Sequence, residues 1–103
     1  MTTDATKADA RDKLAALRNG FESRLRERVQ ELHDAVEAAC AQDDLGLPRT
    51  EELAHKLAGT AGSYGFLEVG EISAELEALC IAGFDPEVAR ALVERLWAAL
   101  GRA

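Results

Sequence analysis

The sequence has few aromatic residues and almost no proline or cysteine. Aromatic residues make up 5% of the 103 residues, and there are two prolines and two cysteines. Strands favour aromatic and β-branched side chains, whereas the apolar content of 48% is mostly Ala, Leu and Val. No strand-like alternation of apolar and polar residues is present. We therefore expect one all-α domain, since the length allows one modest core.

The sequence also lacks long apolar runs and paired cysteines. No stretch approaches the roughly 20 apolar residues of a membrane span, and the polar Met1–Asp12 segment lacks the apolar core of a signal peptide. Cys40 and Cys80 are isolated, which predicts reduced, buried thiols rather than a disulfide. A soluble cytoplasmic protein is the expectation.

Charge of one sign is not clustered along the chain. The net charge is −7, with acidic and basic residues mixed, whereas nucleic-acid binders usually show a clustered basic face. We therefore expect neither nucleic acid nor a membrane as a partner. The polar surface and short loops favour a monomer.

The apolar residues recur with helical spacing. Residues 1–7 are predicted to be a flexible N-terminus, and residues 8–101 one domain. From 8 to 41, apolar residues recur every three or four positions. Asn19-Gly20 could divide this segment into a short extra N-terminal helix and a long one. We prefer a continuous or slightly kinked helix, because the apolar stripe keeps its phase across the pair.

Three further helices are predicted from start and stop signals. Pro48 fits the first position of the second helix, which should end at Gly65 in the left-handed conformation. The third spans about 68–82, and the fourth starts at Asp85-Pro86-Glu87, an N-cap followed by proline and an acid. Four amphipathic helices joined by short loops predict an antiparallel four-helix bundle.

The stretch 51–66 puts apolar and small residues on opposite faces. His55 stands next to Ala58, Gly59 and Gly62. Glycine inside a helix costs about 0.5–1 kcal/mol relative to alanine. The small residues around His55 therefore indicate that another molecule approaches the imidazole closely. The opposite face is predicted to be buried by Leu53, Leu57, Ala61 and Tyr64.

Several catalytic signatures are absent from the sequence. There is no phosphate-cradling glycine loop, no His-x-x-x-His pair and no Gly-x-Ser-x-Gly elbow. His33, the other histidine, is expected to be a surface residue without a role, and no metal site is predicted. An exposed imidazole is a competent nucleophile near neutral pH. Since phosphoryl transfer needs mainly in-line approach and charge stabilisation, a bare histidine suits a phosphoryl carrier whose partner supplies the catalytic groups.

The segment His55–Phe66 closely resembles the signature of histidine phosphotransfer (HPt) domains, and Glu68–Glu77 resembles the next helix of that family. The resemblance extends over essentially residues 10–100. It implies a four-helix bundle that accepts a phosphoryl group on His55 and exchanges it with the aspartate of a receiver domain. It implies that Gly59 permits close approach of the receiver. The protein would then be a carrier rather than an enzyme, without a cofactor, and Mg²⁺ would be held by the receiver.

One position departs from the family pattern. Many members carry lysine three residues after the histidine, where this chain has Ala58. Lys56 is turned by about 100° from His55 and is predicted either to swing toward a phosphoryl oxygen or to stay solvated. Ser63 lies on the His55 side, where it would hydrogen-bond a partner or be an ordinary polar residue. Phe66 is expected to cap the helix.

The preferred interpretation is a phosphorelay protein of a two-component regulatory system, fed by a sensor histidine kinase and passing phosphoryl groups between receivers. An exposed apolar rim with Leu14, Leu17 and Phe66 would be the docking surface. One alternative is the phosphodonor module of a chemotaxis-type histidine kinase, in which a kinase acting on ATP phosphorylates His55. Another is a helical adaptor that is never phosphorylated.

Overall fold

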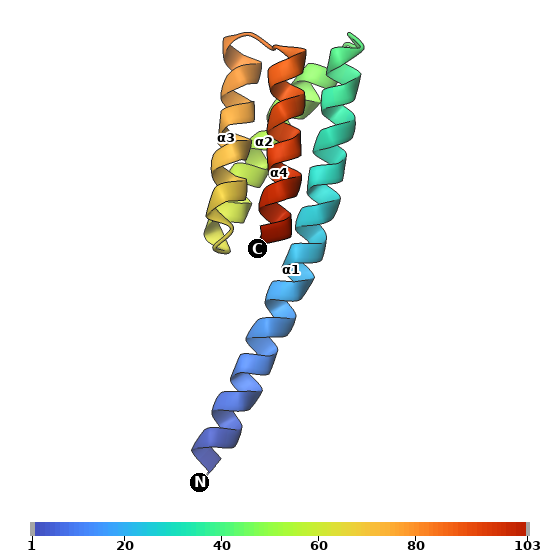
Figure 1. Ribbon diagram of the computed structural model, residues 1–103. Helices are drawn as coiled ribbons and strands as arrows, with labels where there is room; N and C mark the ends of the chain where they lie inside the picture. Colours follow the sequence, from blue (N-terminus) through green and yellow to red (C-terminus); the bar gives the residue numbers. More distant parts are fainter. Residues whose placement is uncertain (1, 103) are drawn as a thin grey trace.

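The protein is a bundle of four helices, and the bundle predicted from the sequence is confirmed. The computed structural model describes the backbone of residues 2–102 and the side chains of residues 9–101. Its elements are α1 (Thr2–Cys40), α2 (Gly46–Ser63), α3 (Leu67–Ala82) and α4 (Pro86–Arg102). Consecutive helices run antiparallel (Figure 1). Both α1 and α3 pack against α2 and α4, so α1 and α3 lie diagonally opposite each other.

All four helices contribute to one apolar core. Burying one Leu or Ile side chain contributes about 1.5–3 kcal/mol. The hydroxyls of the buried Thr50 and Ser73 each donate to the carbonyl four residues earlier, at 2.7 and 2.8 Å, so neither is left unsatisfied. The largest fully buried apolar side chains are Leu25, Leu32, Ile72, Leu76, Leu96 and Leu100.

Helix α1 is continuous through Asn19-Gly20, as preferred from the sequence, and no separate N-terminal helix forms within the described residues. It begins at Thr2, six residues before the expected start at residue 8. Residues 2–7 contain no proline or glycine, and an existing helix extends readily through such a segment. Whether residues 1–7 are flexible stays a prediction. The first half of α1 extends beyond the bundle, and the whole molecule measures 62 × 19 × 18 Å (Figure 1).

Helix α2 begins at Gly46, two residues before the expected start at Pro48. Gly46 is buried against α1, where a Cβ atom would collide with the backbone of Ala38 and Ala39. A side chain at this position is therefore excluded, and the close contact fixes how the α1–α2 loop enters the bundle. The loop is further held by Asp43, whose carboxylate accepts a hydrogen bond from the backbone N–H of Leu45 at 3.0 Å.

The turn after α2 closes the foot of the bundle, the end from which α1 extends. Gly65 adopts a φ of 85°, as predicted, and Phe66 is buried while its N–H donates to the carbonyl of Ala61 at 2.9 Å. The prediction that Tyr64 lies in the core is wrong, because it follows the last helical turn and its side chain is 59% exposed. Its ring stacks on Phe21, with 4.0 Å between centroids.

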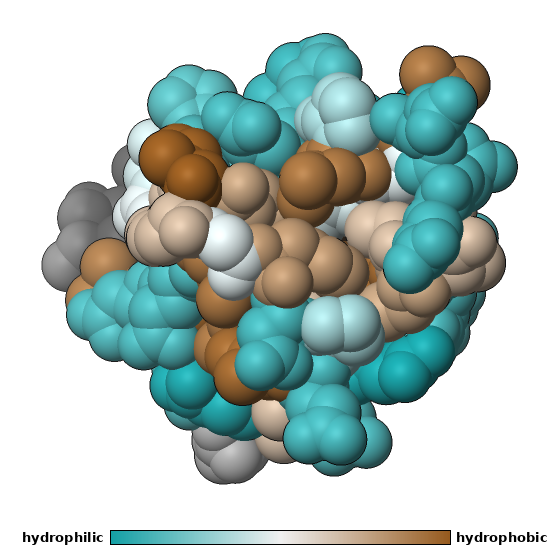
Figure 2. Space-filling view, turned by 90° about the horizontal axis from the view of Figure 1, so that it is seen from above, coloured by the Kyte–Doolittle hydropathy of each residue, from teal (hydrophilic) through white to brown (hydrophobic). Residues whose placement is uncertain are grey.

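The opposite end, formed by the α1–α2 and α3–α4 loops, is mixed in polarity. Figure 2 looks onto this end and shows apolar residues interrupted by hydrophilic ones. The exposed apolar side chains of these segments are Leu45, Leu47, Ile81 and Val88.

The last helix starts as predicted. The carboxylate of Asp85 accepts hydrogen bonds from the backbone N–H groups of Glu87 and Val88, at 3.0 and 3.2 Å, and so caps α4. No helix in the described range is long and apolar enough to cross a membrane.

Both cysteines are free thiols, as predicted. Cys80 is buried in α3 as predicted, whereas Cys40, near the end of α1, is only half-buried and not buried as predicted. Burial, reinforced by the negative charges of Glu51 and Glu77, raises the pKa of Cys80 to about 11. The Cys80 thiol is therefore protonated across the physiological range.

Candidate functional site

Helix α2 presents His55 to solvent by burying the opposite face. The side chain of His55 is 73% exposed. Leu57 and Ala61 are buried as predicted, but Leu53 is only half-buried, because the buried face is rotated toward Ala54. The residues of α2 that pack into the bundle are Gly46, Thr50, Ala54, Leu57 and Ala61.

The imidazole of His55 is held by a carboxylate from the next helix. Nδ1 of His55 lies 2.7 Å from Oε2 of Glu77 in α3, and the Glu77 side chain is 25% exposed. An ionised carboxylate only accepts hydrogen bonds, so this contact places the ring hydrogen on Nδ1. Nε2 then keeps its lone pair. The site is a single imidazole with one nitrogen occupied and the other available as a nucleophile.

Close packing of α2 on α3 makes this contact possible. A Cβ atom at Gly70 in α3 would lie 3.1 Å from the carbonyl oxygen of Ala58 and 3.3 Å from the nitrogen of Gly62. Both distances are shorter than ordinary carbon contacts, so a larger residue at position 70 would push the helices apart. Gly70 therefore helps to bring Glu77 within hydrogen-bonding distance of His55.

The two glycines predicted to flank the histidine border open space. Gly59 is exposed and Gly62 half-buried, and a Cβ atom added to either would meet no heavy atom within 4 Å. Packing within this chain thus gives no reason for a missing side chain on this surface. That geometry agrees with clearance for an approaching molecule, and the role itself stays a prediction.

Lys56 and Ser63 have partners within α2 rather than at the histidine. Nζ of Lys56 lies 2.9 Å from Oε1 of Glu52, and this hydrogen bond lowers the pKa of the Glu52 carboxyl. The hydroxyl of Ser63 donates to the carbonyl of Gly59 at 2.9 Å, and Ser63 remains exposed. The site therefore brings together His55 and Glu77, while Lys56 is engaged on another face.

That other face is a groove of about 330 Å³ between α1 and α2. Lys56 lines it together with Arg24 and Arg28 from α1, over a floor that includes Leu25 and Leu57. The Arg28 guanidinium also lies 3.3 Å from a carboxylate on its own helix. These three cations thus border the groove on the α1 side, whereas the imidazole of His55 contacts Glu77 of α3.

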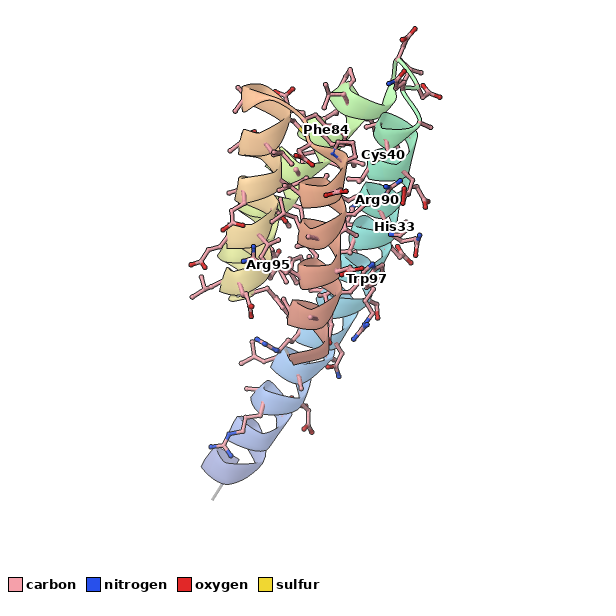
Figure 3. The ribbon with its side chains drawn as sticks, turned by 45° about the horizontal axis from the view of Figure 1, so that its top comes forward. His33, Cys40, Phe84, Arg90, Arg95 and Trp97 are labelled. Atoms are coloured by element: carbon pink, nitrogen blue, oxygen red, sulfur yellow. The ribbon has the colours of Figure 1, made fainter. Side chains whose placement is uncertain are left out.

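His33 lies on a different side of the molecule from His55. Figure 3 shows it on α1, alongside Arg90 and Trp97 of α4. Arg90 forms hydrogen bonds of 3.0–3.2 Å to the carboxylate of Glu37, which lower the pKa of Glu37. No cluster of three potential metal ligands occurs among the described residues. His33 thus lies at the α1–α4 side of the bundle, whereas His55 contacts α3.

Two residues of the site received no role from the sequence. Glu77 and Gly70 belong to α3, and both act on α2 across the helix pair. The sequence did contain one indication of the role of Glu77: it is an acidic residue beside the apolar stripe of a helix that was predicted to run antiparallel to α2. The expected docking contribution of Phe66 is wrong, because its side chain is 4% exposed.

Fold and site together define a four-helix bundle that displays one oriented surface histidine. The profile of a protein family described as Hpt domain matches residues 6–103, and the chain belongs to this family. It is accordingly a histidine phosphotransfer module of phosphorelay signal transduction. Members of this family interact with receiver domains and kinases. Among curated proteins and among solved structures, no significant match to the chain was found.

Proposed function

We propose that this protein accepts a phosphoryl group on Nε2 of His55 from the aspartyl phosphate of one receiver domain and passes it to another. The observation that carries the proposal is the 2.7 Å contact between Nδ1 of His55 and Glu77, on a side chain that is 73% exposed. The Glu77 carboxylate orients one ring nitrogen, and the other is left to act as the nucleophile. A sensor histidine kinase would feed this relay in the cytoplasm.

The proposed step is a balanced in-line displacement. The lone pair on Nε2 attacks phosphorus, the bond between phosphorus and the aspartyl oxygen breaks, and the electron pair leaves with the receiver's carboxylate. The imidazole ring gains positive charge as the P–N bond forms, while its Nδ1–H remains hydrogen-bonded to Glu77. A carboxylate at that position stabilises the developing charge. Reversal of the same step transfers the group to the second receiver.

The partner supplies the remaining catalytic groups in this proposal. Transfer requires neutralisation of the charge on the phosphoryl oxygens, which we assign to Mg²⁺ held by the receiver. Gly59 and Gly62 provide clearance for the receiver's active site, because a Cβ atom at either position would meet no heavy atom of the described residues within 4 Å. Ser63 offers a hydroxyl at the edge of that space. Lys56 reaches a phosphoryl oxygen only after its ion pair with Glu52 breaks. Because this pair is exposed, breaking it costs little free energy.

The test uses the two histidines of the chain as a matched pair. The protein is incubated with a ³²P-labelled receiver, and label that is acid-labile and base-stable is counted on the parent, His55→Gln and His33→Gln. We expect the parent and His33→Gln to take up label equally and His55→Gln to take up none. Labelling of His55→Gln at the parent's rate would refute the assignment. Receiver binding without labelling of any variant would favour the adaptor.

A further inference from the structure

The part of α1 outside the bundle, here called the arm (residues 2–20), carries an uncovered apolar stripe. Ala10, Leu14, Leu17 and Phe21 are spaced by four, three and four residues, so they share one helix face. Phe21 is buried in the bundle, whereas Leu14 and Leu17 are 66% and 68% exposed. The face that packs into the core thus continues into solvent without a covering element.

The charged residues that flank this stripe on its two sides are all cationic. Lys13 lies on one side of it and Arg11 on the other, each about 70–90° from its centre. Arg18 lies on the same side as Arg11, and its guanidinium stacks on the ring of Phe66 at 4.7 Å. Asp9 and Asp12 are turned further to the rear. Lys13 pairs with Asp9 at 3.3 Å, but this pair is exposed and therefore weak. Two arms in a coiled coil would bring cations against cations, so the complement of the arm is an acidic apolar surface rather than another arm.

The outer face of α3 has that composition. No lysine or arginine occurs between Lys56 and Arg90. Within this stretch, Leu67 and Ile81 are 66% and 70% exposed at the two ends of α3. The exposed stripe joining them consists of Leu67, Glu71, Ala74, Ala78 and Ile81, which all follow helical spacing.

We propose that the arm docks on α3 of a second copy, in a closed antiparallel dimer. Within each copy, α3 lies diagonally opposite α1. If a second copy is rotated by a half turn in the plane of Figure 1, its α3 therefore comes to lie beside the apolar stripe of the first copy's arm. The arm is about 28 Å long and α3 about 24 Å. Leu17 then lies against Leu67 of the second copy, and Lys13 near its Glu71.

Symmetry makes this contact occur twice, so the dimer closes and the buried area doubles. The arm would lie about 80° around α3 from Glu77, next to the His55 site without covering it. This dimer replaces the monomer favoured by the sequence, and it is independent of phosphoryl transfer, because neither the arm nor the stripe includes His55 or Glu77.

Sedimentation velocity on the full chain tests the surface. We expect the parent to be a dimer, and the double substitution Leu14→Ser with Leu17→Ser to raise the dimer Kd at least 10-fold. Both side chains are exposed, so the bundle should keep its helical circular dichroism. A parent that remains monomeric at 100-fold the concentration of the assay would overturn the proposal, as would a dimer insensitive to the two substitutions.

A charge exchange distinguishes arm–α3 pairing from arm–arm pairing. Lys13→Glu alone and Glu71→Lys alone each place like charges at both symmetric contacts. The dimer Kd of each variant should therefore rise at least 10-fold. In a mixture of the two variants, one contact of the heterodimer joins the two substituted side chains and the other joins the two original ones. Both contacts then carry opposite charges, and we expect heterodimers in native mass spectra.

Glu94→Lys, an exposed position on α4, serves as the control for net charge, and it should dimerise as the parent does. A mixture of the Lys13→Glu and Glu71→Lys variants that stays monomeric would refute this arrangement. Homodimers of Glu71→Lys as tight as the parent's would also refute it.

Discussion

At the scale of single residues, the decisive contact is the one between His55 and Glu77. Replacing Glu77 by Gln keeps an oxygen that can accept from Nδ1 but removes the negative charge. We expect phosphoryl uptake from a labelled receiver to slow about 10- to 100-fold, as when carboxylates that orient metal-bound imidazoles are lost. Glu75→Gln is the matched control, since Glu75 lies on the same helix and pairs with Arg95 of α4 at 2.8 Å. Equal rates for both variants would remove Glu77 from the mechanism.

The two cysteines should differ in reactivity. The thiolate is the reactive form, and burial raises the pKa of Cys80 from 9.0 to about 11, which reduces its thiolate about 100-fold. At pH 8, iodoacetamide should therefore modify Cys40 at least 100 times faster than Cys80, as measured by peptide mass spectrometry. In denaturant the two rates should become equal. Equal rates in the native protein would contradict the burial of Cys80.

The same pKa shift has a consequence for stability. The folded state holds the Cys80 proton to a higher pH than the unfolded state does. The unfolded chain therefore binds fewer protons between about pH 9 and 11, and the free energy of unfolding falls as pH rises through that window. Below pH 9 the contribution is fully present.

The sequence predicted the exposure of His55 but not its partner. Exposure follows from local helical spacing, since Leu57 and Ala61 define the buried face of α2. Glu77 lies 22 residues further along the chain, and its contact depends on the distance between two packed helices. That distance is set by the close approach at Gly70, which periodicity does not reveal.

At the scale of helices, the glycines of α2 and α3 have different roles. Replacing Gly59 by Gln adds a side chain that meets no heavy atom within 4 Å of its Cβ. Because glycine is a poor helix former, we expect this change to raise the free energy of unfolding by about 0.5–1 kcal/mol. Transfer from a receiver should nevertheless slow at least 10-fold, while uptake from a small donor such as phosphoramidate should not change.

Gly20→Gln is the control for that prediction. A Cβ atom at Gly20 meets only the end of the flexible Arg24 side chain, at 3.8 Å, and the position lies at the foot of the bundle. This variant should gain stability and keep the full rate with both donors. If Gly59→Gln also keeps the full rate with the receiver, clearance at Gly59 has no part in docking.

Helix ends set by local chemistry were predicted, and ends set by packing were not. Gly65 takes a positive φ and Asp85 caps α4 through its own carboxylate, both within a few residues of the boundary. The start of α2 at Gly46 instead depends on the backbone of α1 pressing against it. Only the tertiary structure shows that contact, so the sequence placed the start at Pro48.

At the scale of the whole molecule, helical periodicity was sufficient for the bundle, because four apolar stripes of similar length have few ways to bury one another. It did not determine where α1 leaves the bundle. The stripe through Leu14, Leu17 and Phe21 has one pattern, yet Phe21 is buried and the two leucines are exposed. The change occurs where α2 ends and no helix remains beside α1 (Figure 1).

This division of α1 predicts that the arm can be removed without loss of the bundle. Deleting residues 1–17 takes away no side chain of the core, so urea unfolding in dilute solution should give a free energy within about 0.5 kcal/mol of the parent's. Circular dichroism should show less helix. Leu14 and Leu17 lie about 20 Å from His55 along the bundle axis, so receiver transfer should keep its full rate while the dimer is lost. A slower transfer would return these leucines to the docking surface, and a large loss of stability would mean that the arm folds back on its own bundle.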